Sequence, residues 1–129
     1  VIPTGLKIPH IGWNALEVCR QHPIFRDVKP GDCVYFVHSY YGANCPAVIA
    51  TAEYGAELTA AVRNGNVCGV QFHPEKMFGF NPQVAQAIFD FFIKKADETG
   101  FLYRLLLLLF YCCFSFYRNH NFRPEPSSK

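Results

Sequence analysis

A histidine and a glutamate two residues apart are the side chains in this sequence best suited to acid–base chemistry. The segment Gly69-Val70-Gln71-Phe72-His73-Pro74-Glu75 is predicted to be a strand that ends on the histidine. Residues two apart on an extended chain point to the same side, so Glu75 can turn back toward the His73 ring. A carboxylate there fixes the imidazole tautomer and stabilises the protonated ring, as a general base requires. A surface salt bridge is the alternative that these two residues leave open.

Three strands and one helix are predicted around this pair. The strands cover residues 33–38, 47–52 and 66–72, which are short apolar runs rich in β-branched residues. Turn signals, Lys29-Pro30-Gly31-Asp32 and Asn64-Gly65, precede the first and the third. A helix is predicted from Asn81 or Pro82 to Lys95, because apolar residues recur there at helical spacing. Together these elements indicate an α/β fold.

Length and charge limit the classes of protein to consider. The chain has 129 residues, half of them hydrophobic, with 12 basic and 10 acidic side chains and a formal net charge of +2. This length allows one domain or a piece of one. The near balance of charge argues against nucleic-acid binding, and the hydrophobic content excludes a disordered chain. The chain opens Val1-Ile2-Pro3 and its one methionine is Met77, so we expect a fragment or a processed product.

The six cysteines indicate a reduced, cytoplasmic protein rather than a disulfide framework. They show no Cys-x-x-Cys spacing, and no signal peptide accompanies them. Cys68 stands five residues before His73, and the sequence shows no complete set of ligands at zinc-site spacing. We therefore predict no metal site and expect no cofactor. The cysteines are Cys19, Cys33, Cys45, Cys68, Cys112 and Cys113.

The composition changes after Gly100, where residues 101–117 are nearly all Leu, Phe, Tyr and Cys. A membrane span needs about 20 apolar residues, so the length disfavours a membrane role. Two further interpretations stay open: a terminal helix that packs on the domain, and a tail from an altered reading frame that is unrelated to the fold. We accordingly divide the chain into residues 1–95 and an atypical tail, residues 96–129.

The string Gln71-Phe72-His73-Pro74-Glu75 resembles the His-Pro-Glu signature of the triad, or class I, glutamine amidotransferases. Three further segments narrow the resemblance. In their order and spacing they resemble the glutaminase subunits of imidazole glycerol phosphate synthase, over about residues 2–76. The segments are Lys7-Ile8-Pro9-His10-Ile11-Gly12-Trp13-Asn14, then Tyr35-Phe36-Val37-His38-Ser39-Tyr40-Tyr41, then Tyr54-Gly55 leading to Ala60-Ala61-Val62 and Gly65-Asn66-Val67.

The resemblance implies the C-terminal half of a flavodoxin-like, three-layer amidotransferase domain, with a mostly parallel sheet and flanking helices. In the family a cysteine thiolate attacks the glutamine amide and a histidine moves the proton. The released ammonia passes to a partner (β/α)8 cyclase, as a step of histidine biosynthesis. The expected substrate is therefore glutamine, and the expected partner is a cyclase subunit bound as a heterodimer.

The resemblance also assigns residues to the catalytic and substrate sites. Carried over by position, His73 is the base and Glu75 is the carboxylate that orients it. Ser39 and Tyr40 lie at the glutamine site and act through backbone groups.

Four residues are expected to face the cyclase: Trp13, Asn14, Tyr35 and Lys76. Simpler roles stay open for three of them, since Trp13 fits a core aromatic, Tyr35 fits sheet packing and Lys76 fits a solvated charge. His10 and His38 are interpreted as structural, hydrogen-bonded histidines.

The family nucleophile stands in a Gly-x-Cys-x-Gly elbow, which none of the cysteines here matches. Cys33 and Cys68 fall inside predicted strands, and Cys45 is followed by proline. The Gly-rich oxyanion segment is also missing, so we expect the chain by itself to be inactive. After Lys76, residues 77–81 replace the small, polar continuation expected of the family. Two other hypotheses stay open: a truncated, non-catalytic module that binds the cyclase, and a membrane-tethered remnant.

Overall fold

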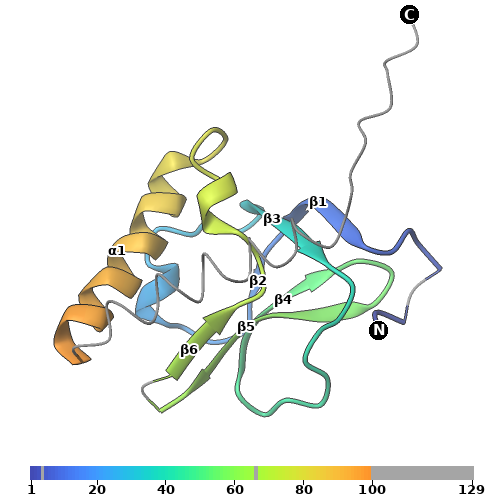
Figure 1. Ribbon diagram of the computed structural model, residues 1–129, viewed down its shortest axis with the longest axis horizontal. Helices are drawn as coiled ribbons and strands as arrows, with labels where there is room; N and C mark the ends of the chain where they lie inside the picture. Colours follow the sequence, from blue (N-terminus) through green and yellow to red (C-terminus); the bar gives the residue numbers. More distant parts are fainter. Residues whose placement is uncertain (4, 66, 100–129) are drawn as a thin grey trace, which may run out of the picture. The chain divides into compact units, whose positions relative to one another are not determined.

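The computed structural model describes residues 1–3, 5–65 and 67–99 (Figure 1). The Leu-rich stretch predicted over residues 101–117 lies outside them, as does most of the 96–129 tail. The strands are β1 (His10–Ala15), β2 (Glu17–Val18), β3 (Cys33–His38), β4 (Val48–Glu53), β5 (Glu57–Asn64) and β6 (Val67–Val70). The helices are the short 3-10 turns η1 (Pro23–Phe25) and η2 (Pro74–Lys76), and α1 (Pro82–Thr99).

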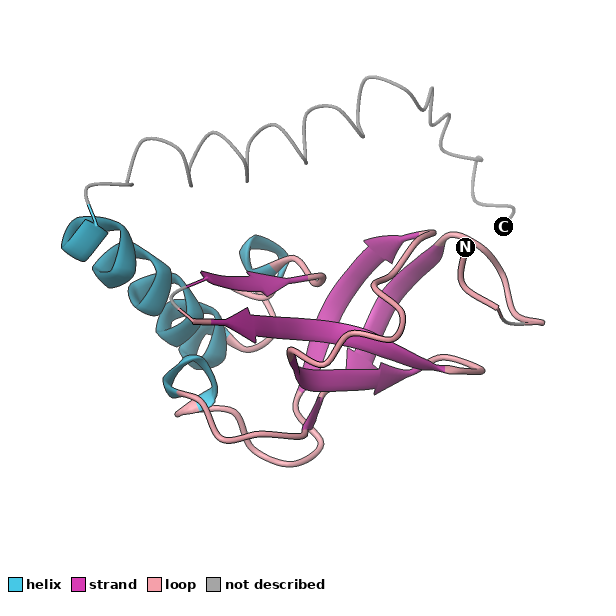
Figure 2. Ribbon diagram, turned by 90° about the horizontal axis from the view of Figure 1, so that it is seen from below, coloured by secondary structure: helices cyan, strands magenta, loops and turns pink. Residues whose placement is uncertain are grey.

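The described strands form two sheets, in which every pairing is antiparallel. β1 pairs with β3, and the second sheet has the order β2-β4-β5-β6. Figure 2 shows the strands in magenta. The mostly parallel sheet expected from the resemblance is therefore not found among the described residues. The links explain this difference, because β4 reaches β5 through Tyr54–Ala56 and the turn after β5 begins at Gly65. Such short links make hairpins, whereas parallel neighbours need a crossover of about a dozen residues.

The sequence predicted β3 with its observed bounds, and it predicted β4 and β6 to within two residues. The turn before β3 also has the expected form: the Asp32 amide donates to the Lys29 carbonyl at 3.0 Å, and Gly31 has φ +87°. Sequence analysis missed β1, β2 and β5. Strand β1 contains glycine and asparagine, which strands disfavour, so its pairing with β3 imposes the extended form.

The buried apolar side chains come from both sheets, from η1 and from the first part of α1. Along β3 the buried residues are Val34, Phe36 and His38, while the residues between them are half-buried. Asn81 caps the N-terminus of α1, because its side chain accepts a hydrogen bond from the Val84 amide at 3.3 Å. The helix ends at Thr99 rather than at Lys95. Its fully buried side chains are Val84, Ala85 and Ile88.

Candidate active site

The segment that follows β6 places His73 beside the middle of β3. The Gln71 amide donates to the Ala60 carbonyl of β5, and the His73 amide donates to the Tyr35 carbonyl of β3, both at 2.8 Å. Pro74 is buried and begins η2, which carries Glu75 directly after the histidine. The strand-end placement predicted from the sequence is therefore present, and His73 lies where the two sheets meet.

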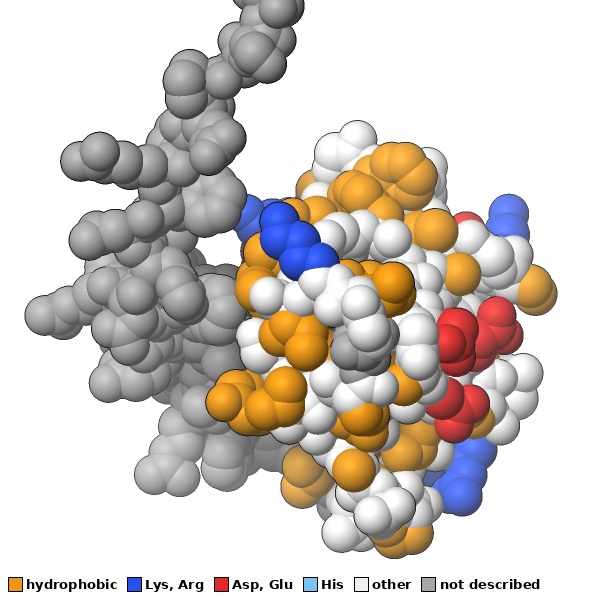
Figure 3. Space-filling view, turned by 90° about the vertical axis from the view of Figure 1, so that its right-hand side faces the viewer, with side chains coloured by type: hydrophobic (Ala, Val, Ile, Leu, Met, Phe, Trp, Pro, Cys, Tyr) orange, Lys and Arg blue, Asp and Glu red, His pale blue; other side chains and the backbone are white. Residues whose placement is uncertain are grey.

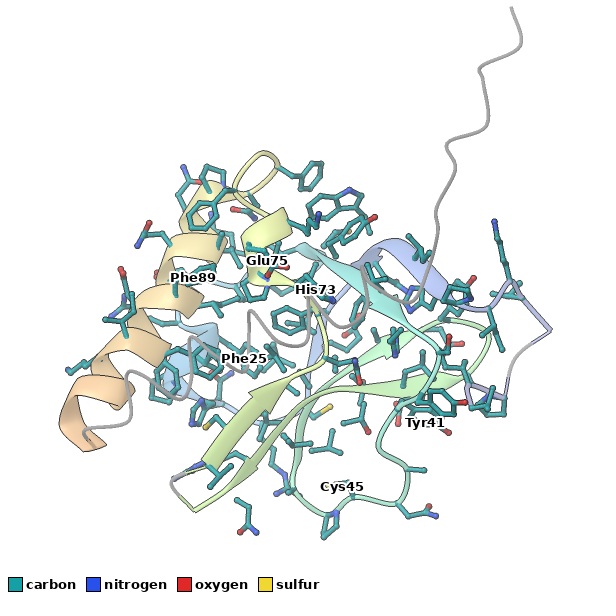
Figure 4. All side chains as sticks on the ribbon, viewed as in Figure 1. Phe25, Tyr41, Cys45, His73, Glu75 and Phe89 are labelled. Atoms are coloured by element: carbon teal, nitrogen blue, oxygen red, sulfur yellow. The ribbon has the colours of Figure 1, made fainter. Side chains whose placement is uncertain are left out.

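The side chains of His73 and Glu75 form the contact that their spacing predicts (Figure 4). His73 Nδ1 lies 2.8 Å from Glu75 Oε1, and the two side chains are 23% and 37% exposed. Because a carboxylate accepts, Nδ1 carries the proton, and in the neutral ring Nε2 then holds the lone pair. This is the tautomer in which an imidazole can take a proton from a nucleophile while the carboxylate stabilises the resulting charge.

The predicted glutamine-binding residues, Ser39 and Tyr40, directly follow β3. The Ser39 carbonyl accepts a hydrogen bond from the Ile2 amide at 3.0 Å. The Tyr40 carbonyl lies 2.9 Å from His38 Nδ1, while the Tyr40 side chain is 70% exposed. The backbone of this segment is thus held at two carbonyls, in keeping with a role through backbone groups.

Two of the four predicted partner-facing residues form an aromatic group on the outer face of the β1–β3 pair. Trp13 lies opposite Tyr35 in the register and meets it edge to face, with ring centroids 5.3 Å apart. Trp13 is 41% exposed, which excludes the core alternative. Phe80, which the sequence analysis did not single out, packs on Trp13 with centroids 4.6 Å apart and is itself exposed.

The other two predicted partner-facing residues are Lys76 and Asn14. Lys76 is exposed at the end of η2. Asn14 follows Trp13 on β1 and donates from Nδ2 to the Glu53 carbonyl of β4 at 2.7 Å. This bond gives Asn14 a structural role between the sheets that the spacing did not reveal, and its role at a partner surface stays a prediction.

His10 and His38 are buried, as a structural role requires, and they are hydrogen-bonded to each other. His10 Nδ1 lies 3.0 Å from His38 Nε2, and the two residues are opposite one another in the β1–β3 register. Burial, and after it the neighbouring His38, lowers the pKa of His10 to about 4. Burial also lowers the pKa of His38. The hydrogen bond to the Tyr40 carbonyl raises this pKa, and the nearby His73 lowers it further. Both rings are therefore neutral at pH 7.

The described cysteines occupy other places than a nucleophile elbow. Cys33 and Cys68 lie within β3 and β6, as expected, and Cys68 Sγ is 3.8 Å from His22 Nε2. Cys19 Sγ is 3.7 Å from the Thr51 hydroxyl, and Cys45 is half-buried in a loop. Cys112 and Cys113 lie outside the described residues. Within residues 1–3, 5–65 and 67–99, no group of three or more His, Cys, Asp or Glu side chains is arranged to hold a metal ion.

The surface offers a groove and several exposed apolar patches. A groove of about 420 Å³ lies between Arg26 and the first turns of α1, and its lining includes none of the predicted site residues. Apolar side chains are also exposed on the face shown in Figure 3. No helix of the part of the chain that the structure describes is long and apolar enough to span a membrane.

Comparison with known families identifies the group of proteins to which this arrangement belongs. The family model described as glutamine amidotransferase class-I matches residues 3–95. The chain belongs to this family. Its membership agrees with the His-Pro-Glu signature and with the His73–Glu75 contact, while the described part of the amidotransferase domain consists of antiparallel sheets and a helix.

Three of the relatives with which the chain can be aligned carry the same name. The chain is 46% identical over 95 residues to the imidazole glycerol phosphate synthase subunit HisH of Natronomonas pharaonis, covering 70% of this chain and 44% of the relative. It is 49% identical over 74 residues to the subunit of the same name from Methanosarcina acetivorans, covering 55% and 37%. The corresponding values for Syntrophotalea carbinolica are 51% over 73 residues, 55% and 35%. The chain therefore spans less than half the length of these relatives.

The lowered pKa of His10 predicts that the protein loses stability in mild acid. The unfolded chain binds a proton at His10 near pH 6.5, whereas the folded chain binds it only near pH 4. The contribution is thus fully present above pH 6.5 and is lost as the pH falls toward 4, by at most about 3 kcal/mol. Urea unfolding between pH 7 and 4 measures this slope. His10→Asn removes the titrating group and should flatten the slope; an unchanged slope would contradict the assignment.

Proposed function

We propose that this chain is the C-terminal half of a glutaminase subunit that supplies ammonia to the cyclase of imidazole glycerol phosphate synthase, in histidine biosynthesis. The observation that carries the proposal is the His73–Glu75 contact at 2.8 Å, placed after β6 in a chain about half identical to subunits of that name. Residues 1–95 supply this half of the domain, and residues 96–129 are assigned no role. The setting proposed is the cytoplasm.

The chemistry assigned to His73 is proton transfer during hydrolysis of the glutamine side-chain amide. A cysteine thiolate attacks the amide carbon, and the protonated His73 gives its proton to the leaving nitrogen, so that ammonia departs and a thioester remains. His73 Nε2 then takes a proton from water as the water attacks the thioester, which releases glutamate. Glu75 holds Nδ1–H in both steps and stabilises the positive charge on the ring.

His73 and Glu75 form only part of the proposed catalytic site. The described cysteines do not lie on a nucleophile elbow, and the groove beside α1 is not lined by His73. We therefore assign the nucleophile, the oxyanion donors and the parallel strands of a flavodoxin-like, layered domain to further residues of the whole protein. By itself the chain is expected to hydrolyse no glutamine.

The partner surface is assigned to the outer face of the β1–β3 pair, with Trp13, Tyr35 and Lys76. Tyr35 links this surface to the catalytic site, because its carbonyl accepts from the His73 amide while its ring packs on Trp13. A cyclase docked there lies next to the atoms that release ammonia. Exposed aromatic side chains of this kind are typical anchors of protein interfaces.

A second candidate function is a non-catalytic module that binds the cyclase and leaves glutamine intact. The exposed aromatic surface favours it, since this surface is present in the chain whether or not a nucleophile is supplied. One hybrid subunit distinguishes the two functions. In this hybrid, residues of this chain replace the matched segment of the Methanosarcina acetivorans relative. Glutamine-dependent synthesis by this hybrid with its cyclase supports the first function, and binding without such synthesis supports the second.

His73→Ala in that hybrid should abolish glutamine-dependent synthesis, by about a thousandfold or more, because the substitution removes the imidazole that moves the proton. Synthesis from added ammonium salts should stay within about twofold of the unsubstituted hybrid, since the cyclase site is untouched. Steady-state rates with each nitrogen source measure the two effects. Loss of both activities would refute the assignment of His73 as the base.

Glu75→Gln should be the milder change. The amide still occupies the position beside Nδ1 but no longer carries the charge that stabilises the imidazolium. The rate of this variant should therefore stay about a hundredfold above the rate of His73→Ala. The same assay with glutamine measures this difference. A loss equal to that of His73→Ala would show that Glu75 does more than orient and stabilise the ring.

Trp13→Ala should weaken cyclase binding about tenfold, because the substitution removes the central exposed ring of the proposed surface. Val67→Ala is the matched control, since Val67 is also apolar and 71% exposed but lies on β6. Titration calorimetry with the purified cyclase gives both dissociation constants. Equal affinities for the two variants would place the partner surface elsewhere.

A further inference from the structure

The buried histidine pair, His10 and His38, reaches the proposed glutamine site through hydrogen bonds with one fixed direction. A carbonyl oxygen can only accept, so His38 Nδ1 donates to the Tyr40 carbonyl at 2.9 Å. Because the neutral His38 then has no proton on Nε2, His10 Nδ1 must donate to that atom across the 3.0 Å contact. Both rings are thereby assigned the Nδ1–H tautomer.

The surroundings of the pair keep it in this form. His10 is stacked between the rings of Tyr54 and Phe36, with centroids at 3.9 Å and 4.9 Å, and only 2% of the residue is exposed. The titratable side chains that face the pair are Tyr54, from the turn after β4, and His73, from the segment after β6. Aromatic faces on both sides hold the His10 ring in the plane from which Nδ1 can reach His38.

Two hydrogen bonds to carbonyl groups of Ser39 and Tyr40 determine the orientation of two peptide groups after β3. A peptide group is planar, so a fixed carbonyl also fixes the direction of the next amide. The His38 bond to the Tyr40 carbonyl thus orients the Tyr41 amide. The Ile2 bond to the Ser39 carbonyl orients the Tyr40 amide in the same way.

From this geometry we infer that His10 and His38 are positioning residues, which hold the Tyr40–Tyr41 peptide group in the orientation that binds glutamine. The inference rests on the proposed function for the identity of the ligand, and it goes beyond that function by assigning a task to two residues outside the His73–Glu75 pair. His38 acts directly on the Tyr40 carbonyl, and His10 acts by determining which nitrogen of His38 carries the proton.

The first test uses the 129-residue chain and needs no activity. Long-range proton–nitrogen NMR correlations report the tautomer of each ring, and the inference requires Nδ1–H for both. Carbonyl carbon-13 chemical shifts then compare His38→Gln, whose amide nitrogen lies too far along the side chain for the Tyr40 bond, with His38→Asn, whose amide nitrogen replaces Nδ1. Because a hydrogen bond to a carbonyl oxygen deshields its carbon, the Tyr40 carbonyl signal should move upfield in His38→Gln and stay near its wild-type position in His38→Asn.

Two results of this first test would overturn the inference. One is an Nε2–H tautomer for either ring in the wild-type chain, which decides the matter even where a variant fails to fold. The other is an unchanged Tyr40 carbonyl shift in a folded His38→Gln chain, which would show that the bond does not hold this peptide.

The second test links the pair to glutamine, in the hybrid subunit bound to its cyclase. His38→Gln should raise the KM for glutamine about tenfold with little change in kcat, and His38→Asn should restore the KM to within about threefold. Ammonia-dependent synthesis is the control for folding and cyclase activity. A lower kcat with an unchanged KM would overturn the assignment to glutamine binding. If the unsubstituted hybrid hydrolyses no glutamine, the proposed function fails, whereas the tautomer and carbonyl-shift data still decide whether the pair holds the peptide.

Discussion

Two backbone hydrogen bonds, from Gln71 to Ala60 and from His73 to Tyr35, join the two sheets of this protein at the place where its chemistry is assigned. Strand β6 ends on the larger sheet, and the three residues after it cross to β3. This crossing holds His73 near β3 and near the segment that follows β3. Buried backbone amides must find acceptors, so the crossing is as constrained as any ladder within a sheet.

Strand β3 has two different faces because its side chains alternate between the core and the outer surface. Its inner face carries Phe36 and His38 into the core, while its outer face presents Tyr35 to Trp13. The same strand therefore carries core side chains on one face and part of the proposed partner surface on the other. A substitution that slipped the register of β3 by one residue would exchange the two faces and would harm both proposed activities together.

The sequence predicted the features that local chemistry decides. Strand β3, the turn through Gly31, the helix start at Asn81 and the reach of Glu75 to His73 all depend on residues close together in the chain. The features it missed depend on distant partners. Nothing within β1 indicates a strand until β3 pairs with it, and the bond from Asn14 to Glu53 joins residues 39 positions apart. The antiparallel order follows from how the hairpins assemble, while the resemblance describes the family's whole domain.

The position of the histidine pair has an electrostatic consequence for the proposed base. When His73 takes up a proton, its ring becomes positive close to His38, and a charged His38 would oppose that step in a medium of low dielectric constant. Burial lowers the pKa of both His10 and His38, so the pair stays neutral while His73 takes up its proton. A lysine or arginine could also donate to the Tyr40 carbonyl, but it would bring a permanent charge beside the base. Neutral imidazoles hold the backbone without that cost, which gives a physical reason for using two histidines at this position.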